Sequence, residues 1–203
     1  EFHYLHHQPG GRPYADIAET SARIAAAAAQ TGIGLCLVPV QYQFGGCDGR
    51  ALGAGQDRFG NDADRFAVLH AGAVAGLSGL PSDRTHGAAP HSLRAVSQQD
   101  LRSFADRFPT GPLHIHLAEQ IPEVVEVQRN WGARPVEWAL DNIGLDDRWC
   151  AIHCTQMTPK ESLRLAQSGT VAGLCPITES SLGDGIFDGV RWLDQGGAIA
   201  IGS

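Results

Sequence analysis

Short runs of apolar residues alternate with longer segments of helical periodicity along the whole chain. Several of the runs are unbroken aliphatic stretches, which is typical of strands in a parallel sheet that is buried on both faces. The predicted strands are Phe2 to His6, Ile33 to Val40, a weak one ending near Ala89, Leu113 to Leu117, Trp149 to His153, Val171 to Cys175 and Ala198 to Ile201. Strands and helices that alternate in this way predict successive βαβ units.

The segments between these strands carry helix signals. Ser97 is a predicted N-cap, and Thr158 to Glu161 has the spacing of a capping box with proline at the first helical position. The predicted helices are Ala15 to Gln30, Asp64 to Leu77, Gln98 to Phe108, Ile121 to Asn130, Pro135 to Asn142, one that opens at Pro159 and is closed by Gly169, and Phe187 to Gln195.

Two α/β architectures fit this alternation, a barrel and a doubly wound sheet. The doubly wound sheet normally has a glycine-rich phosphate turn after its first strand, and the chain has no GxGxxG pattern. We therefore predict a TIM-like (β/α)8 barrel, as a single domain over residues 1–203. The chain opens on Glu1 without an initiator Met, and its last apolar run stops at Ser203. We expect a partial barrel, with the first strand absent and the last strand truncated.

Composition and net charge limit the classes of partner that the protein could bind. The 203 residues are 43% hydrophobic, which is enough for one substantial core. The formal net charge of -7 disfavours a nucleic-acid partner, which would need a basic face, and an anionic substrate would need locally placed arginines. No apolar run approaches the roughly 18 residues of a membrane helix, and no signal peptide is visible. We expect a cytoplasmic protein without a membrane partner. A homodimer is compatible with the sequence but is not indicated by it.

The cysteines favour buried, reduced thiols over disulfides, because their number is odd and no CxxC pair is present. A metal-binding trio of Cys150, His153 and Cys154 is the alternative. Strand geometry disfavours it, since the two cysteines fall on one face and His153 on the other. A cysteine nucleophile is also disfavoured, because neither thiol precedes a helix start that would lower its pKa.

Candidate chemistry gathers where predicted strands end. The active site of a barrel of this kind lies at the carboxyl ends of its strands. The strand Leu113 to Leu117 alternates, so that His114 and His116 share one face, and Glu119 follows. His153 ends the strand that comes next along the chain. Neutral imidazoles at such positions suit a zinc ion with an open position for water, and Glu119 could carry a proton from water to a leaving group. The set predicts metal-assisted hydrolysis. Taken singly, the histidines could instead satisfy hydrogen bonds and Glu119 could be a helix-start carboxylate.

Further polar residues follow two other strands. His91 and Arg94 come after the weak strand, and Tyr4 lies in the first strand, where its hydroxyl could point inward. We expect His6 and His7 to face solvent in a loop, because a turn composition follows them.

Two connections remain open to interpretation. The long glycine-rich connection Gly45 to Phe59 is either a lid or merely mobile. The segment Thr178 to Gly185 is predicted only as a loop.

The segments that carry these candidate residues resemble those of the amidohydrolase superfamily. Within it, they most resemble the formimidoylglutamate deiminases of histidine degradation. The resemblance runs over essentially the whole chain. Its segments, in order, are EFHYLHH, the FGG of the long loop, APHSLRAV, HIHLAEQ, RPVEWALDNIGLDDRWCAIHCT, GTVAGLCPITESSLGDGIF and the closing IAIGS.

The resemblance implies a role for each matching residue. His116 would bind the metal, Glu119 would handle protons and His153 would sit beside the metal's water. His91 and Arg94 would bind substrate, with Arg94 pairing with a carboxylate of the glutamate moiety and Tyr4 making a further contact. A guanidinium is physically suited to that contact because it can bind a carboxylate through two hydrogen bonds.

The resemblance also implies an activity and its limits. The parent protein would use one divalent ion, zinc or else iron or manganese, to hydrolyse N-formimidoyl-L-glutamate to N-formyl-L-glutamate and ammonia. The superfamily's first-strand HxH would precede Glu1, and its last-strand Asp would follow Ser203, so the fragment itself is expected to be inactive. The alternatives are a nucleobase or heterocycle deaminase or chlorohydrolase of the same superfamily, and a non-catalytic ligand-binding barrel.

Overall fold

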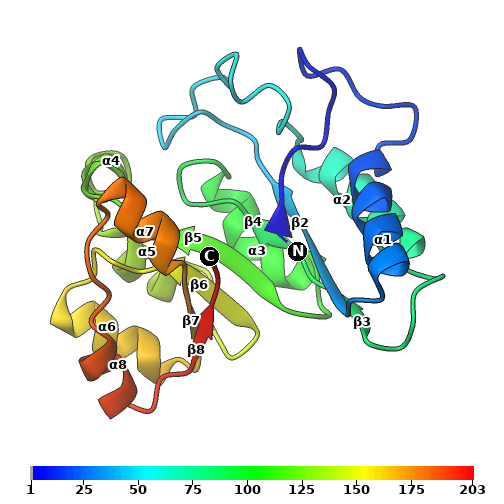
Figure 1. The fold of residues 1–203 in the computed structure, drawn as a ribbon. Coiled ribbons are helices and arrows are strands. Elements are labelled where there is room, and N and C mark those ends of the chain that lie inside the picture. The colour runs from blue at the N-terminus through cyan, green and yellow to red at the C-terminus, as the bar shows by residue number, and fades with distance from the viewer. Residues whose placement is uncertain (1) are drawn as a thin grey trace.

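A curved sheet of parallel strands, with helices packed on its outer side, forms the framework of the molecule (Figure 1). The computed structural model describes residues 2–203. Its strands are β1 (Phe2–His3), β2 (Leu35–Gln41), β3 (Arg84–His86), β4 (Ala89–Pro90), β5 (Leu113–Leu117), β6 (Trp149–His153), β7 (Val171–Leu174) and β8 (Ile199–Ile201). They coincide closely with the predicted strands, except that β1 ends at His3 and does not reach His6.

The strands lie in the sheet in the order in which they occur in the chain. β2 pairs with β1 on one side and with β3 and β4 on the other, and β5, β6, β7 and β8 form a second parallel set. Isolated parallel bridges from Ala88 to Leu113 and from Ser92 to His116 join the two sets through β5. The α/β class with parallel strands is therefore confirmed. Over residues 2–203 the sheet does not close into a barrel.

Helices connect successive strands. They are α1 (Glu19–Thr31), α2 (Ala63–Gly76), α3 (Gln98–Arg107), α4 (Ile121–Trp131), α5 (Pro135–Asn142), α6 (Pro159–Gln167), α7 (Pro176–Leu182) and α8 (Gly189–Asp194). The predicted cap at Ser97 and the capping box at Thr158 are both confirmed by side-chain bonds to backbone N–H groups. The helix α7 is a correction, because the sequence predicted only a loop there.

The alternation along β5 separates the core from the site. Leu113, Ile115 and Leu117 are fully buried and belong to the main core cluster, together with apolar side chains of the neighbouring helices. Burying one such side chain contributes about 1.5–3 kcal/mol. His114 and His116 are only partly buried on the opposite, inner face. Packing of the aliphatic face therefore fixes the direction in which the histidines project.

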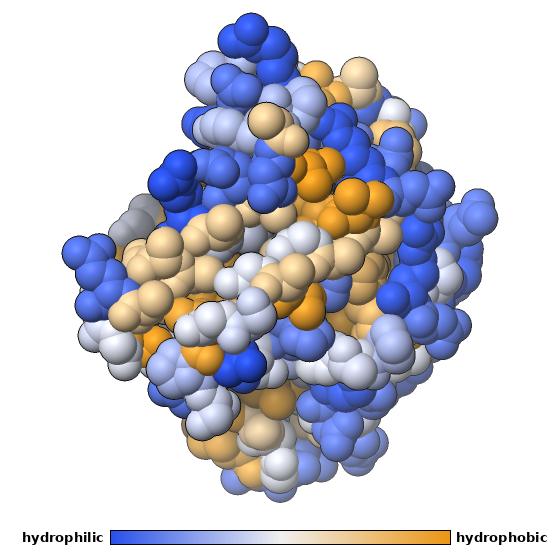
Figure 2. Space-filling model, turned by 90° about the vertical axis from the view of Figure 1, so that its right-hand side faces the viewer, coloured by the Kyte–Doolittle hydropathy of each residue, from blue (hydrophilic) through white to orange (hydrophobic). Residues whose placement is uncertain are grey.

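Apolar residues also reach the surface. On the side that α1 and α2 present, they form a band between polar margins (Figure 2). No helix within residues 2–203 is both long enough and apolar enough to cross a bilayer.

Candidate functional site

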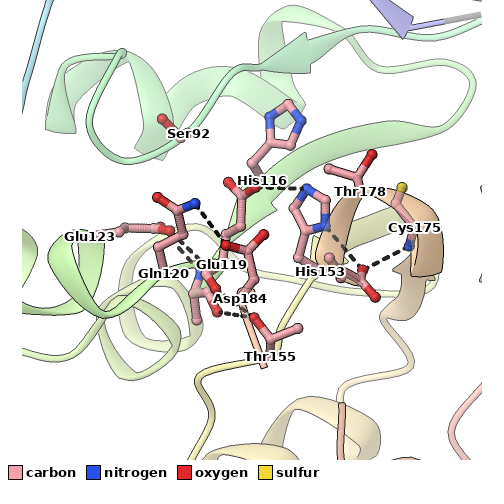
Figure 3. Close-up of polar contacts among 12 residues, drawn as sticks. Ser92, His116, Glu119, Gln120, Glu123, His153, Thr155, Cys175, Thr178 and Asp184 are labelled. Carbon is pink, nitrogen blue, oxygen red and sulfur yellow. Dashed lines mark hydrogen bonds and ion pairs between the residues drawn. The ribbon is translucent and has the colours of Figure 1, made fainter. Parts of the chain in front are cut away.

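Three of the predicted site residues meet where β5 and β6 end. The imidazoles of His116 and His153 stack with their centroids 5.6 Å apart and their planes 17° apart. Nε2 of His153 lies 3.5 Å from Oε1 of Glu119, and Nδ1 of His153 lies 3.0 Å from Oε1 of Glu179 (Figure 3). We call His116, Glu119, His153 and Glu179 the hydrolytic pole. The first three were predicted from sequence, and Glu179 was not.

The backbone around this pole adopts conformations that non-glycine residues rarely adopt. Ala118, His153 and Cys154 have φ values of 50°, 75° and 52°. Residues held in this left-handed region cost on the order of 1–3 kcal/mol each, and they cluster at functional sites. Cys154 N–H donates to the Leu117 carbonyl at 3.0 Å, which holds the two strand ends together. The strained turns bring Glu119 and His153 face to face.

His116 is held in the form that a metal ion requires. Its Nδ1 lies 2.9 Å from the His91 carbonyl oxygen, which can only accept, so Nδ1 carries the proton and the lone pair lies on Nε2. Burial lowers the pKa of His116 to about 4, so the ring is neutral at pH 7. A neutral imidazole with its second nitrogen bonded to a carbonyl is a well-oriented ligand. His116 therefore fits the role of metal ligand.

The described residues do not by themselves provide a complete set of metal ligands. Within residues 2–203, no group of three or more His, Cys, Asp or Glu side chains is placed to hold a metal ion. His116 could therefore supply one ligand of a site that needs further ligands.

Glu119 stands in an environment that favours its protonated form. Burial raises the pKa of Glu119 and the negative charge of Asp184 raises it further, whereas the charges of His153 and Arg94 act in the opposite direction. Its loop is pinned by Glu123, which accepts from the backbone N–H groups of Ala118 and Glu119 at 3.1 and 2.9 Å. Glu119 is therefore fixed in place and able to exchange a proton. The sequence analysis did not single out Glu123.

Glu179 reaches the site from α7. Its Oε1 accepts from the Cys175 backbone N–H at 2.7 Å as well as contacting His153. Because a carboxylate only accepts, it fixes the proton of His153 on Nδ1 and turns Nε2 toward Glu119. Pro176, at the first helical position, was the signal in the sequence that could have revealed this helix.

The other predicted residues lie where β1, β2 and β4 end. The ring of His91 lies 5.1 Å from that of Tyr4, 4.4 Å from that of Tyr42 and 4.6 Å from that of His116. Phe59 packs against Tyr4 at 4.8 Å. We call Tyr4, Tyr42, Phe59, His91 and Arg94 the recognition pole. It adjoins the hydrolytic pole through the contact between His91 and His116. Tyr42 and the contact made by Phe59 were not predicted from the sequence.

Arg94 supplies a positive charge without a carboxylate partner. No ion pair joins it to any of residues 2–203, and its Nε is buried without a hydrogen-bond partner there. Burial lowers the pKa of His91 and of His116, and the Arg94 charge lowers both further. A partly buried cation with an unsatisfied donor is costly unless an anion binds to it.

The chain is similar in sequence and in structure to known hydrolases. Over its whole length it is 45% identical to the formimidoylglutamate deiminase of Pseudomonas aeruginosa, of which it covers 45%. A solved amidohydrolase from Brucella melitensis is 48% identical, with a TM-score of 0.97 over 100% of this chain and 45% of that one. The resemblance to the amidohydrolase superfamily is confirmed. The chain spans less than half the length of these two relatives.

Other relatives are named as deaminases of different substrates. The 5'-deoxyadenosine deaminase of Methanopyrus kandleri is 34% identical over 129 residues, covering 63% of this chain and 30% of that protein. A solved adenosine deaminase from Xanthomonas campestris with bound zinc shares the fold, with 24% identity and a TM-score of 0.73 over 89% of this chain and 39% of that one. No protein-family model matches the chain. The formimidoylglutamate deiminase and the 5'-deoxyadenosine deaminase are thus named for different substrates.

The predicted exposure of His6 and His7 is wrong. His6 and His7 were expected to face solvent, and both are fully buried. Both of their backbone N–H groups donate to the Arg58 carbonyl, so the returning long connection covers them. His6 Nε2 bonds to the Val40 carbonyl at 2.8 Å, and His7 Nε2 contacts Asn61 Oδ1 at 3.0 Å.

The long connection is anchored to α4. Glu126 accepts from the Cys47 backbone N–H at 3.0 Å and pairs with Arg50 at 2.8 Å, while Trp131 Nε1 donates to the Cys47 carbonyl at 3.1 Å. These contacts favour an ordered wall over a freely moving segment.

The prediction of buried, reduced cysteines is confirmed only in part. All five are free thiols, but only Cys150 and Cys154 are buried, whereas Cys36, Cys47 and Cys175 are partly exposed. Burial raises the pKa of Cys150 to about 11 and that of Cys154 well above its ordinary value. Neither is suited to act as a thiolate nucleophile.

Proposed function

We propose that this chain forms part of a longer, metal-dependent (β/α)8 hydrolase that converts N-formimidoyl-L-glutamate to N-formyl-L-glutamate and ammonia in histidine degradation. The observation that carries the substrate assignment is the position of Arg94, a cation without a carboxylate partner that lies next to the hydrolytic pole. The 45% identity with a formimidoylglutamate deiminase supports the same substrate. The relatives' greater length supports a barrel that is completed by further strands.

A divalent ion fits the chemistry of His116. We propose that Nε2 of His116 is one ligand and that residues outside this chain supply the others. When bound, such an ion provides Lewis-acid chemistry and a nucleophile derived from water near neutral pH. Zinc is proposed first, since the adenosine deaminase of Xanthomonas campestris binds it, and iron or manganese suits the same ligand type.

The residues of the chain divide the remaining work. Glu119 Oε1 would accept a proton from the attacking water and pass it to the imino nitrogen. A second transfer, from the hydroxyl of the tetrahedral intermediate to the same nitrogen, would break the C–N bond and release ammonia. His153, held at Nδ1 by Glu179, would present Nε2 to the reacting centre, where it would accept a hydrogen bond from the attacking water and orient it.

The recognition pole would bind the glutamate moiety. The Arg94 guanidinium would pair with a carboxylate through two hydrogen bonds, which satisfies its unpartnered donor. Tyr4 and His91 would line the path between this carboxylate and the hydrolytic pole, because their rings lie 5.1 Å apart and His91 contacts His116. The substrate class is thus a small anionic amino-acid derivative.

One observation favours a second candidate. The rings of Tyr4, Tyr42, Phe59 and His91 form an aromatic wall on which a purine could stack. The 34% identity with a 5'-deoxyadenosine deaminase supports this alternative, in which the same hydrolytic pole would act on a heterocycle.

Ammonia release from the complete, metal-loaded polypeptide tests the two candidates. With N-formimidoyl-L-glutamate and 5'-deoxyadenosine offered separately, we expect ammonia from the first and little from the second. Release from 5'-deoxyadenosine alone would overturn the substrate assignment and keep the hydrolytic pole. No release from either would count against a hydrolytic deaminase.

A further inference from the structure

A second carboxylate faces Glu119 from the turn that follows α7. Asp184 is 4% exposed and lies between Gly183 and Gly185, whose φ values are 70° and 113°. Both glycines adopt conformations that side chains disfavour, so the turn places Asp184 at one defined position. Its backbone N–H donates to the Glu179 carbonyl at 3.0 Å. One short segment therefore carries both Glu179 and Asp184 to the site.

Asp184 is held by side chains from two other strand ends. Gln120 Nε2 donates to its Oδ1 at 2.7 Å (Figure 3). Gln156 Nε2 donates to its backbone carbonyl. Its second carboxylate oxygen, Oδ2, is buried and has no hydrogen-bond partner within residues 2–203.

An unsatisfied, buried carboxylate oxygen next to another carboxyl group needs a physical explanation. Leaving such an acceptor unpaired costs about 1–3 kcal/mol, more for a charged group, and two adjacent carboxylates do not both ionise readily. The arrangement is stabilised when one of the two groups is protonated. Glu119 is the group whose proton the proposed reaction requires, and Asp184 is the one already fixed by Gln120.

We propose that Asp184 is a positioning residue for Glu119: its buried carboxylate, tied to Gln120, holds the Glu119 carboxyl toward His153 and stabilises it while it carries the proton. The inference rests on the proposed function. It extends the hydrolytic pole to a chain of four groups, Glu179, His153, Glu119 and Asp184, whose two ends come from one segment. Each of the two protons passes from the oxygen of the attacking water to Glu119 and from Glu119 to the departing nitrogen.

The charges around Glu119 predict how a substitution of Asp184 should change the pKa of Glu119. His153 faces it from β6, Arg94 from the segment after β4, Glu123 from α4 and Cys175 from the end of β7. Arg94 and His153 favour the carboxylate form of Glu119, whereas Asp184 favours the acid form. Removing the Asp184 charge should therefore make Glu119 easier to deprotonate.

The test is the pH profile of Asp184→Asn in the complete, metal-loaded polypeptide. The acid limb of kcat/KM reports deprotonation of the group that accepts the water's proton. We expect this limb to move to lower pH by about one unit and kcat to fall about 10-fold, because the neighbouring charge is lost and Glu119 is held less well. Asp188→Asn is the matched control. Asp188 is exposed on the same connection and pairs with Arg191, so the profile should not move.

Other outcomes decide against the inference. A lower thermal midpoint with an unmoved acid limb would give Asp184 a merely structural role and overturn the proposal. If Asp184→Asn does not fold, Asp184→Ala is measured instead, with the same expected direction. Failure of both variants to fold would also overturn it. Failure of the proposed function is distinguishable, because then the unsubstituted polypeptide would release no ammonia from N-formimidoyl-L-glutamate.

Discussion

At the hydrolytic pole each side chain contacts a polar group from another element, whereas at the recognition pole aromatic rings adjoin a guanidinium that lacks a carboxylate partner. His153 is bonded to Glu179 and faces Glu119, and His116 is bonded to the His91 carbonyl. Arg94 has no such partner within residues 2–203. The difference fits the proposal that one end of the site is preorganised for proton transfer and that the other end binds the anionic group of the substrate.

The largest effect is expected from Glu119→Gln, which keeps the shape of the side chain and removes its ability to carry a proton. Because a positioned acid–base group contributes roughly 10²–10⁴-fold, kcat for ammonia release by the complete, metal-loaded polypeptide should fall by that factor. Substrate binding should change little, since the recognition pole is intact. A loss of binding equal to the loss of turnover would contradict the separation of the two poles.

Arg94→Met should weaken substrate binding, whereas Glu119→Gln should mainly lower turnover. A hydrogen bond to a charged group contributes about 1.5–3 kcal/mol, so kcat/KM for N-formimidoyl-L-glutamate should fall roughly 10- to 100-fold. Turnover of a neutral heterocycle, if the protein accepts one, should change far less. Arg23→Met is a matched control, since Arg23 is exposed and, among residues 2–203, pairs only with Glu19. Equal losses for the anionic and the neutral substrate would count against a carboxylate contact.

Next to the recognition pole, buried neutral histidines predict a dependence of stability on pH. Burial lowers the pKa of His6 from 6.5 to about 3. The unfolded state therefore takes up a proton that the folded state does not, and stability is lost as the pH falls from about 6.5 toward about 3, by up to about 1.4 kcal/mol per pH unit.

The variant His6→Phe removes this contribution. Urea unfolding of the complete polypeptide at several pH values between 4.5 and 7 should therefore give a shallower loss of stability for the variant. The variant also loses the hydrogen bond to the Val40 carbonyl. This loss lowers its free energy of unfolding by the same amount at every pH above about 6.5, so it does not change the slope. The same slope for both proteins would show that His6 does not titrate in unfolding.

The smallest effect is expected from Asp62→Ala. Asp62 caps α2 by accepting from the Arg65 backbone N–H at 2.8 Å, and it belongs to neither pole. Loss of such a cap costs about 1 kcal/mol. The thermal midpoint should drop by a few degrees with kcat and KM unchanged. A large change in activity would show that turnover responds to general loss of stability rather than to the two poles.

Most of the fold could be predicted because its signals are local. The apolar runs coincide with the strands, and α5 has the bounds that the sequence predicted. The alternation of β5 correctly placed the aliphatic side chains on one face and His114 and His116 on the other. Periodicity and capping residues depend only on neighbours in the chain, so one sequence is enough to interpret them.

The unpredicted parts of the site depend on contacts between distant residues. Glu179 lies 26 residues from His153, and Asp184 lies 64 residues from Gln120. In the sequence both carboxylates belong to a short polar stretch, which is equally typical of a loop. His6 and His7 were misjudged for the same reason, because the long connection that buries them returns from around Arg58.

Calorimetric binding of N-formimidoyl-L-glutamate to the complete, metal-loaded Glu119→Gln variant, with and without Arg94→Met, tests the division between the two poles most directly. The account predicts that Glu119→Gln binds the substrate without turning it over, and that adding Arg94→Met weakens binding about 10- to 100-fold. Equal affinity of the single and double variants would contradict it, because the substrate's carboxylate would then not be bound by Arg94.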